Sequence, residues 1–473
     1  MDNKNVWRTK LHSLISNIPL MLFLGTFLAF LFCNSGIYWY SSSERTRYAQ
    51  IKSIAEDNVF YVDRLIPTFP YPQYWDLSLS PNGHYYPNKP PGLTFLGVPI
   101  ISITSTLGIP FPLEGFYLIL LSCFFTSTIV VVLYSLCIKE FEMSEKISLV
   151  VSLIYGFATF AFPHAVTFYA NSFSALFVLL TVYFLIDRNK VDSETKQITR
   201  LLVSGIFAGY LLLLDYSNLF LFLPFLLYLL FIKNRKYSFV FFIPVIFWLS
   251  ILLTYHYIAF GDPFVTTYTY AVHTRNTFDW NNTRPIYVGL YTFLFSPRRG
   301  LFVYSPILLL SIFGFYLMFK EKQDRKEGFL LLSSFLIILF FFSALAYRSG
   351  WIFGSRRLDP ILPLICIPIG RILENPKTIF FGRFQNSLFF EKHRESIFQV
   401  IFASLFLISF LINGIGAITD VHPTTKTLYD HNLELLFSGK LSSLVWNSSP
   451  VLGLLIVLPA IVLIIYAFYK ADW

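Results

Sequence analysis

Long runs of apolar residues, separated by short polar segments, extend along the chain from residue 17 to residue 469. A helix that crosses a membrane needs roughly 20 consecutive, mostly apolar residues. About twelve runs approach this length, and they predict an all-α, polytopic membrane protein whose 473 residues form a single transmembrane domain. The predicted spans are 17–39, 115–137, 147–165, 170–187, 201–216, 218–232, 239–258, 301–319, 329–347, 360–373, 398–419 and 450–469.

One further apolar run, Gly92–Ile109, contains Pro99 and several Ser and Thr residues, so its length alone does not decide whether it crosses the membrane. Lys and Arg accumulate in the cytoplasmic loops of membrane proteins. With a cytoplasmic N-terminus, most of the 36 Lys and Arg residues fall on the cytoplasmic side if this run does not cross, and outside if it does. We therefore expect Gly92–Ile109 to lie at the outer membrane surface, or to dip into the membrane and return.

Composition excludes several classes of protein. Apolar residues make up 55% of the chain and charged residues 13%, about half of the share in a soluble domain. A chain this apolar is neither soluble nor disordered. The net charge of +9 reflects basic cytoplasmic loops rather than nucleic-acid binding. The four cysteines lie in or at the ends of apolar runs, without the spacing of a zinc site or a disulfide framework.

The N-terminus carries Lys4, Arg8 and Lys10 ahead of the first apolar run, and no small-residue cleavage site follows that run. This pattern predicts a retained signal-anchor helix with a cytoplasmic N-terminus, in a multi-pass protein of the cytoplasmic or plasma membrane. Two long loops then lie on the outer side, 40–110 and 259–300, and they carry clustered Tyr, Trp, Arg, Asp and His. Long loops on one face are where a membrane protein carries its chemistry.

The first of these loops holds the candidate catalytic residues. The spacing after Glu44 predicts a helix that leaves the first span, with Glu44 at the boundary between membrane and water. Asp63 and Asp76 follow in loop segments. Lys89 precedes two prolines, which force an extended approach to the next apolar run. A carboxylate at this depth is suited to general-base catalysis, and a lysine is suited to binding phosphate.

These residues resemble the first extracytoplasmic loop of the GT-C glycosyltransferases, most closely the branch that includes the protein O-mannosyltransferases and the aminoarabinose transferase of lipid A. In that branch an Asp-Glu pair follows the first span, an Arg-Tyr-Ala stretch comes one residue later, and a Tyr-x-x-Lys-Pro-Pro segment lies further along the loop. The matching residues here are Glu44-Arg45, Arg47-Tyr48-Ala49 and Tyr86–Pro91. The likeness extends more weakly to Ser296–Gly300 and Gly354–Leu358.

The resemblance implies an integral-membrane glycosyltransferase that moves a sugar from a polyprenyl-phosphate carrier to an extracytoplasmic lipid, glycan or protein, with inversion at the anomeric carbon. The general base of the family, an Asp, falls at Glu44, and the second carboxylate of the pair falls at Arg45, which reverses the charge. Asp63 and Asp76 therefore remain alternative bases. The residues expected to hold the donor phosphate or the sugar are Arg47, His84, Lys89, Arg298, Arg299, Arg356 and Arg357.

Two other functions stay open from the sequence. A transporter or flippase for a lipid-linked or small solute would place ionisable groups in mid-span, where this chain has almost none. A polysaccharide ligase or polymerase would carry its main catalytic loop late in the chain, whereas the first loop is the richer one here. The sequence contains no Walker-type loop and no Rossmann glycine pattern. A divalent cation is a further option, for which a single loop carboxylate gives only weak support.

Overall fold

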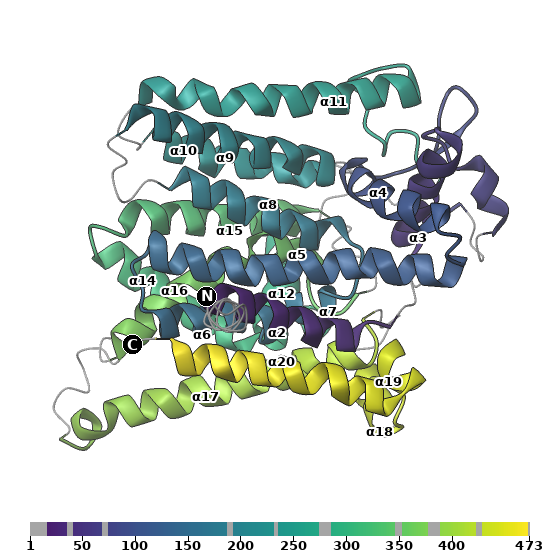
Figure 1. Cartoon of the computed structure of the whole chain (residues 1–473). Helices are drawn as coiled ribbons and strands as arrows, with labels where there is room; N and C mark the ends of the chain where they lie inside the picture. Colours follow the sequence, from purple (N-terminus) through teal and green to yellow (C-terminus); the bar gives the residue numbers. More distant parts are fainter. Residues whose placement is uncertain are drawn as a thin grey trace, which may run out of the picture.

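The computed structural model describes residues 17–35, 41–68, 74–186, 193–230, 235–273, 285–345, 352–376, 388–421 and 428–471. Most of the described chain is helical, and the longer helices lie roughly side by side in one elongated bundle (Figure 1). Lys4, Arg8 and Lys10, on which the predicted signal anchor depends, lie outside the described residues.

The α-helices in chain order are α2 (Ile18–Cys33), α3 (Ser42–Lys52), α4 (Gly92–Thr106), α5 (Phe111–Lys139), α6 (Glu145–Phe157), α7 (Ala161–His164), α8 (Ala170–Leu185), α9 (Glu194–Leu214), α10 (Phe222–Leu229), α11 (Phe242–Phe260), α12 (Ile286–Leu294), α13 (Leu301–Tyr304), α14 (Leu310–Lys320), α15 (Arg325–Ala344), α16 (Leu362–Glu374), α17 (Leu388–Ile418), α18 (Leu433–Phe437), α19 (Leu444–Ser448) and α20 (Pro450–Lys470). Short 3₁₀ or π segments are η1 (Ser53–Asp57), η2 (Asp63–Thr68), η3 (Tyr216–Leu221), η4 (Arg235–Phe241), η5 (Pro306–Leu309), η6 (Arg356–Ile361) and η9 (Leu428–Asn432). The two strands are β1 (Leu77–Leu79) and β2 (Tyr85–Pro87).

The helices coincide with the predicted spans. Each of the twelve predicted segments corresponds to one helix or to consecutive helices, from α2 for segment 17–39 to α20 for segment 450–469. Six helices are long and apolar enough to cross a membrane by themselves, and five shorter apolar helices accompany them among the described residues. The all-α, polytopic membrane fold is therefore confirmed, while the number of twelve crossings stays a prediction.

One predicted span divides in two. The apolar run 147–165 forms α6, which ends at Phe157, and then the single turn of α7. Pro163 lies in the first turn of α7, where its missing backbone N–H breaks no intrahelical hydrogen bond. The chain turns again before α8, where Tyr169 is the N-cap residue.

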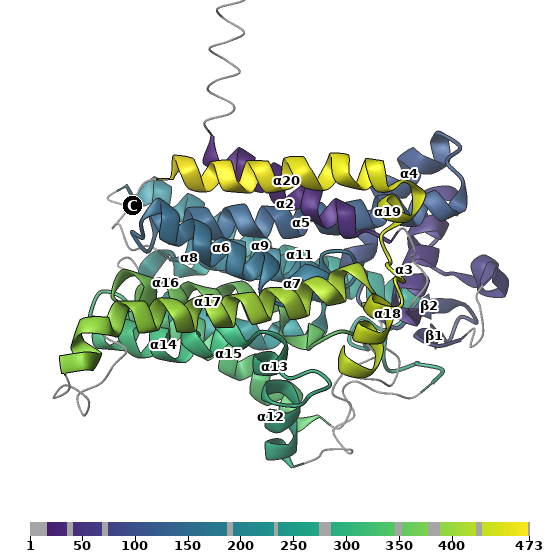
Figure 2. The same cartoon turned by 90° about the horizontal axis from the view of Figure 1, so that it is seen from below.

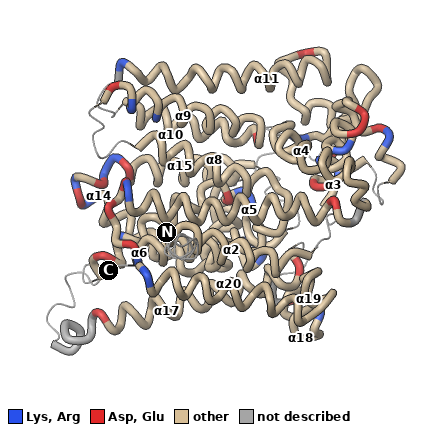
Figure 3. Tube along the Cα trace, viewed as in Figure 1, with Lys and Arg blue, Asp and Glu red and all other residues tan. Residues whose placement is uncertain are grey.

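The chain runs back and forth between two ends of the bundle (Figure 1). We call one of them the α3 end, because α3, α4, both strands, α18 and α19 gather there (Figures 1 and 2). The charged residues lie mostly at the two ends, with few along the helices between them (Figure 3). Since α2 ends and α5 begins at the α3 end, α4 does not cross the bundle and packs beside α3 (Figure 1). This is the arrangement that the charge count favours for Gly92–Ile109.

A small antiparallel sheet at the α3 end joins the two long loops (Figure 2). β1 pairs with β2 across a turn in which Gly83 has a φ of +89°, a conformation that favours glycine. The second loop adds to the free edge of β1: the N–H of Leu79 donates to the carbonyl of Tyr270, and the N–H of Val272 donates to the carbonyl of Leu77, both over 3.0 Å. The two predicted outer loops are thus parts of one structure.

Close contact with α9 fixes the start of α4. The hydroxyl of Tyr210 donates to the carbonyl of Gly92 over 2.8 Å. A Cβ on Gly92 would lie 2.5 Å from the carbonyl oxygen of Leu213, so no residue larger than glycine fits without moving the backbone. This contact positions the preceding Lys-Pro-Pro segment, and with it Lys89, against the bundle.

Candidate active site

Asp76 lies at the centre of a charged cluster at the α3 end. It directly precedes β1 in a left-handed conformation, with φ of +58°, and its side chain is 27% exposed. The hydroxyl of Ser42, the first residue of α3, donates to Oδ2 of Asp76. Nζ of Lys89 lies 3.2 Å from Oδ1. A single carboxylate therefore connects α3 to both arms of the first loop.

Two arginines complete the Asp76 cluster. Arg45 of α3 and Arg356 of η6 each interact electrostatically with Asp76. Burial alone would raise the pKa of Asp76, but the charge of Lys89, the hydrogen bonds from Ser42 and Lys89, and the charge of Arg356 outweigh it and lower the pKa to about 2. Asp76 is thus ionised at neutral pH, and cations from three segments surround it.

Glu44 lies on the same turn of α3 as Ser42 and Arg45. Its side chain, however, contacts a segment outside the Asp76 cluster. Its side chain is buried, and Oε1 accepts the backbone N–H of Phe168 over 2.9 Å while Oε2 accepts the hydroxyl of Ser41 over 3.1 Å. These bonds tie α3 to the turn that precedes α8. Arg47 is also buried on α3, where Nη1 lies 3.5 Å from Oγ of Ser43.

Tyr169 connects Glu44 to the Asp76 cluster. This buried tyrosine interacts electrostatically with Glu44, Arg356 and Asp76. The guanidinium carbon of Arg356 lies 4.5 Å from the centroid of the Tyr169 ring, within cation–π distance. Tyr169 therefore lies near two candidate bases, Glu44 and Asp76, and one candidate phosphate ligand, Arg356.

Asp63 and His84 form a separate pair on the hairpin. Nδ1 of His84 lies 2.6 Å from Oδ2 of Asp63, and Oδ1 accepts the backbone N–H of Tyr85 over 2.7 Å. The His84 ring stacks on Tyr61 with centroids 4.0 Å apart. Both members of the pair are more than one-third exposed on their side chains, at 35% and 41%. The predicted site residues Asp63 and His84 thus contact each other, and Asp63 also accepts a hydrogen bond from the hairpin backbone.

Arg357 and Arg356 are neighbours on η6 but have different partners. Nη1 of Arg357 lies 3.6 Å from Oδ2 of Asp215, and its guanidinium carbon lies 5.0 Å from the Phe342 ring centroid. Arg357 is buried, whereas Arg356 is half-buried beside Tyr169. The sequence predicts the same phosphate-binding role for both arginines, whereas in the structure their side chains have different surroundings.

Arg298 and Arg299 lie in the turn between α12 and α13. Arg298 is exposed, and its carbonyl accepts the hydroxyl of Tyr304 over 3.0 Å. The ring of Tyr304 packs edge-on against Phe353, with centroids 4.7 Å apart, just before η6. The turn therefore borders the segment that carries Arg356.

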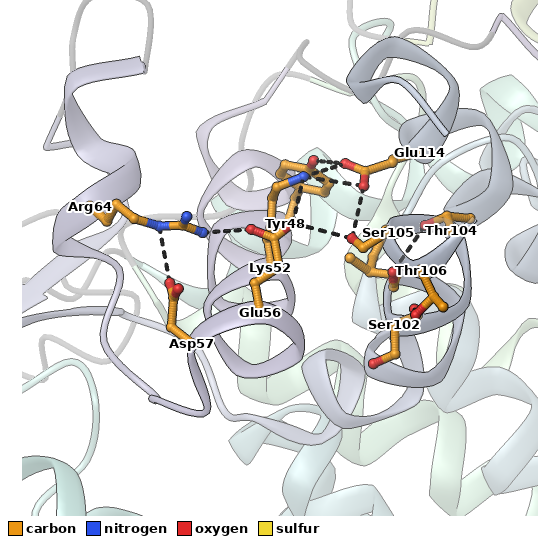
Figure 4. Close-up of polar contacts among 11 residues, drawn as sticks. Tyr48, Lys52, Glu56, Asp57, Arg64, Ser102, Thr104, Ser105, Thr106 and Glu114 are labelled. Carbon is orange, nitrogen blue, oxygen red and sulfur yellow. Dashed lines mark hydrogen bonds and ion pairs between the residues drawn. The ribbon is translucent and has the colours of Figure 1, made fainter. Parts of the chain in front are cut away.

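A polar network holds α3 against α4 and α5 (Figure 4). Glu114, buried in the first turn of α5, accepts the hydroxyl of Tyr48 and, over 2.9 Å, Nζ of Lys52. The hydroxyl of Ser105 on α4 lies 3.3 Å from the same carboxylate. Since Tyr48 follows Glu44 by one helical turn, this network fixes the position of the helix that presents Glu44.

The sequence analysis missed Ser42, Tyr169 and Glu114. Ser42 left a signal, because a hydroxyl in the first turn of a predicted helix is placed to bond a neighbouring loop. Tyr169 left none, since no spacing within the sequence relates it to the first loop. Glu114 lies just before a predicted span, where a solvated carboxylate at the N-terminus of the helix explains the residue equally well.

No protein-family model and no curated protein match the sequence. Solved structures match the fold. The oligosaccharyltransferase of Archaeoglobus fulgidus, in complex with Zn and sulfate, aligns with a TM-score of 0.55 at 11% identity, over 86% of this chain and 54% of its own. ArnT of Cupriavidus metallidurans, bound to undecaprenyl phosphate, aligns with a TM-score of 0.51 at 11% identity, over 84% of this chain and 74% of its own. The chain has a GT-C fold.

This likeness confirms, at the level of the fold, the resemblance found in the first loop. Together with the six long apolar helices, it supports an integral membrane protein. The chain spans about half the length of the oligosaccharyltransferase, 54%. At 11% identity the likeness concerns the arrangement of helices alone.

The charged cluster does not fit a divalent cation. No group of three or more His, Cys, Asp or Glu side chains that would hold a metal ion occurs among the described residues. Asp76 has Lys89, Arg45 and Arg356 around it, and cations at these positions repel a metal ion. The same surroundings favour an anion.

Proposed function

We propose that this protein is a membrane glycosyltransferase that moves a sugar from a polyprenyl-phosphate donor to a hydroxyl or amine of a lipid, glycan or protein, with inversion. The observation that carries the proposal is the convergence of Arg45, Lys89 and Arg356 around Asp76 at one end of a GT-C fold. Three cations against one carboxylate leave an excess of positive charge, which suits a phosphate.

The leaving group gives these cations a catalytic use. As the bond between the anomeric carbon and the phosphate oxygen breaks, the polyprenyl phosphate gains negative charge. Cations already in position stabilise that charge more in the transition state than in the ground state. Lys89 and Arg356 are the proposed phosphate ligands, because both are held in place, Lys89 by Asp76 and Arg356 by the ring of Tyr169.

Glu44 is the proposed general base. A base works best when its pKa lies near the working pH. Asp76, with a pKa near 2, accepts a proton poorly, and its role is to hold Lys89. Asp63 is bonded to His84 and to the hairpin backbone. Glu44 is buried, fixed by Phe168, and close to Tyr169. It would take the proton of the acceptor as the new glycosidic bond forms.

The proposed reaction takes place on the outer side of the membrane. The active-site segments lie at the α3 end (Figure 1). The opposite end carries the short basic loops, which the positive-inside rule assigns to the cytoplasm. A lipid-linked donor at the outer surface needs no nucleotide-binding domain.

The experiment compares the wild type with Glu44→Gln and with Asp63→Asn as the matched control. The full-length protein is incubated with a panel of polyprenyl-phosphate sugars and host membrane extract, and free polyprenyl phosphate is measured. We expect Glu44→Gln to lower the turnover by at least ~100-fold, the lower range for losing a general base, with little change in KM. Asp63→Asn should retain most of the activity.

Two further variants test the phosphate ligands. Lys89→Met and Arg356→Gln should each raise the KM for the donor and lower kcat, because each cation contacts the leaving phosphate. Equal turnover in the wild type and Glu44→Gln would move the base elsewhere. No release of polyprenyl phosphate by the wild type with any donor, when a control transferase works, would refute the glycosyltransferase.

A further inference from the structure

His164 and Asp359 form a buried pair beside Arg356. Nδ1 of His164 lies 2.9 Å from each carboxylate oxygen of Asp359, and Nε2 lies 2.8 Å from the carbonyl oxygen of Phe353. The hydroxyl of Ser172 lies 3.4 Å from Oδ2 of Asp359. Both side chains are almost fully buried, with exposures of 1% and 4%. The pair joins α7 and the start of α8 to η6.

The hydrogen bonds define the proton count of this pair. A carbonyl oxygen only accepts hydrogen bonds, so Nε2 of His164 carries a hydrogen. Nδ1 is equally distant from both oxygens of Asp359, so a hydrogen bond joins this nitrogen to the carboxyl group. One proton therefore lies between Nδ1 and the carboxyl group, and with that proton on either partner the pair carries no net charge.

Asp359 lies on the same short helix as Arg356. η6 begins at Arg356, and the charge of Arg356 reaches both Asp359 and Asp76. Two carboxylates therefore compete for one guanidinium. Ionisable groups that interact with Asp359 include His164, Arg356 and Tyr155. Of these, His164 is the group that hydrogen-bonds to both carboxylate oxygens.

The backbone on the other side of His164 is equally constrained. The carbonyl of Phe353 accepts Nε2, and the next residue, Gly354, has a φ of +63°. A Cβ on Gly354 would lie 3.1 Å from Cβ of Phe160. His164 thus holds the turn that leads into η6 at one nitrogen and η6 itself at the other.

We propose that His164 is a positioning residue that neutralises Asp359 and so leaves the charge of Arg356 to the phosphate of the lipid donor. The proposal depends on the proposed function, because it names how that site keeps its phosphate ligand available. Without His164, the charge of Arg356 still acts on the buried carboxyl group of Asp359, and the guanidinium is drawn from the donor.

The test compares variants that change the net charge of the His164–Asp359 pair with variants that keep it. In Asp359→Asn, Nδ1 of His164 can accept the Asn N–H while Nε2 keeps its hydrogen, so the pair is neutral and hydrogen-bonded. In His164→Gln, Asp359 loses the imidazole that shares its proton, so an ionised Asp359 leaves the pair with one negative charge. In the double variant His164→Gln/Asp359→Asn, the pair is neutral again. Ser172→Ala removes a hydrogen bond without changing the charge and serves as the matched control.

The probe is undecaprenyl phosphate, and its binding to the full-length protein in nanodiscs is measured, with undecaprenol as the uncharged control lipid. We expect His164→Gln to raise the Kd for undecaprenyl phosphate at least about tenfold, a loss of ~1.4 kcal/mol. Asp359→Asn, Ser172→Ala and the double variant should bind within about threefold of the wild type. Binding of undecaprenol should be the same in all five proteins.

The pattern among the variants decides between charge and structure. A purely structural pair predicts that Asp359→Asn and the double variant weaken binding as much as His164→Gln does, and this result would overturn the proposal. Unchanged binding in His164→Gln, or no binding of undecaprenyl phosphate by the wild type, would also overturn it. Wild-type binding with the expected pattern, but without sugar transfer, would refute the glycosyltransferase and retain the role of His164.

Discussion

Replacing Lys89 by Met removes the cation that lies 3.2 Å from Asp76 and keeps most of the aliphatic stem. The pKa of Asp76 is about 2, against an ordinary value of 3.8. Since one pKa unit corresponds to 1.36 kcal/mol, the lowered pKa stabilises the folded protein by about 2 kcal/mol at neutral pH. Without Lys89, burial acts on Asp76 with less opposition. We therefore expect Lys89→Met to lose most of this stabilisation.

The sign of the pKa shift fixes the pH dependence. A carboxyl group with a lowered folded-state pKa stabilises the protein above its unfolded pKa, and this contribution disappears as the pH falls through the folded pKa. For Asp76 the relevant window lies between 3.8 and about 2. The difference in stability between the wild type and Lys89→Met should be full at pH 7, roughly half as large at pH 3, and near zero below pH 2.

The assay is a double-mutant cycle of Lys89→Met and Asp76→Asn, with unfolding followed in detergent micelles. A direct pair predicts a coupling energy of about 2 kcal/mol, because Asp76→Asn should cost far less once Lys89 is absent. Lys440→Met, which changes an exposed lysine at the same end of the bundle, is the control and should have little effect. Additive effects of the two changes, or a difference that persists unchanged at low pH, would refute the reasoning.

Three other residues give direct predictions. Glu114→Gln should lower the free energy of unfolding by about 2 kcal/mol, because the buried carboxylate accepts hydrogen bonds from Tyr48 and Lys52. Thermal unfolding measures this loss, with Glu56→Gln, at a more exposed carboxylate, as the control. Gly354→Ala should destabilise the protein by at least ~1 kcal/mol, the cost of a left-handed conformation for a residue with a Cβ, as denaturant unfolding would show. Tyr169→Leu should weaken binding of undecaprenyl phosphate several-fold by removing the ring beneath Arg356, whereas Tyr169→Phe should not; equal binding in both variants would contradict the cation–π contact.

The fold follows from the sequence because membrane helices leave a strong pattern. A membrane span needs a long apolar run, and its backbone groups must be hydrogen-bonded within the segment, which makes it a helix. The position of a span and its helical structure can therefore be predicted without knowing which helices pack against it. Even the path of Gly92–Ile109 follows from counting charges. The run 147–165 is the exception, since apolarity continues through residue 165 while α6 ends at Phe157.

The site is only partly readable, because its members come from distant segments. The motif around Lys89 and the first of the paired arginines before α16 come together near Asp76. The sequence contained no means of separating Arg356, which faces Asp76, from Arg357, which faces Asp215. It also did not show that Asp63 pairs with His84, since their contact depends on the hairpin turn. The assignment of Glu44 as the base stays a prediction.

The distribution of the site along the chain has a consequence for biogenesis. Ser42, Asp76 and Lys89 are synthesised well before Arg356, which follows helices α2 to α15 in the chain. The early loop must therefore persist as a partial assembly in which Asp76 has Ser42 and Lys89 as partners. A nascent chain arrested before η6 should insert into the membrane and form the hairpin, yet it should not retain a lipid phosphate until the last third of the protein joins the bundle.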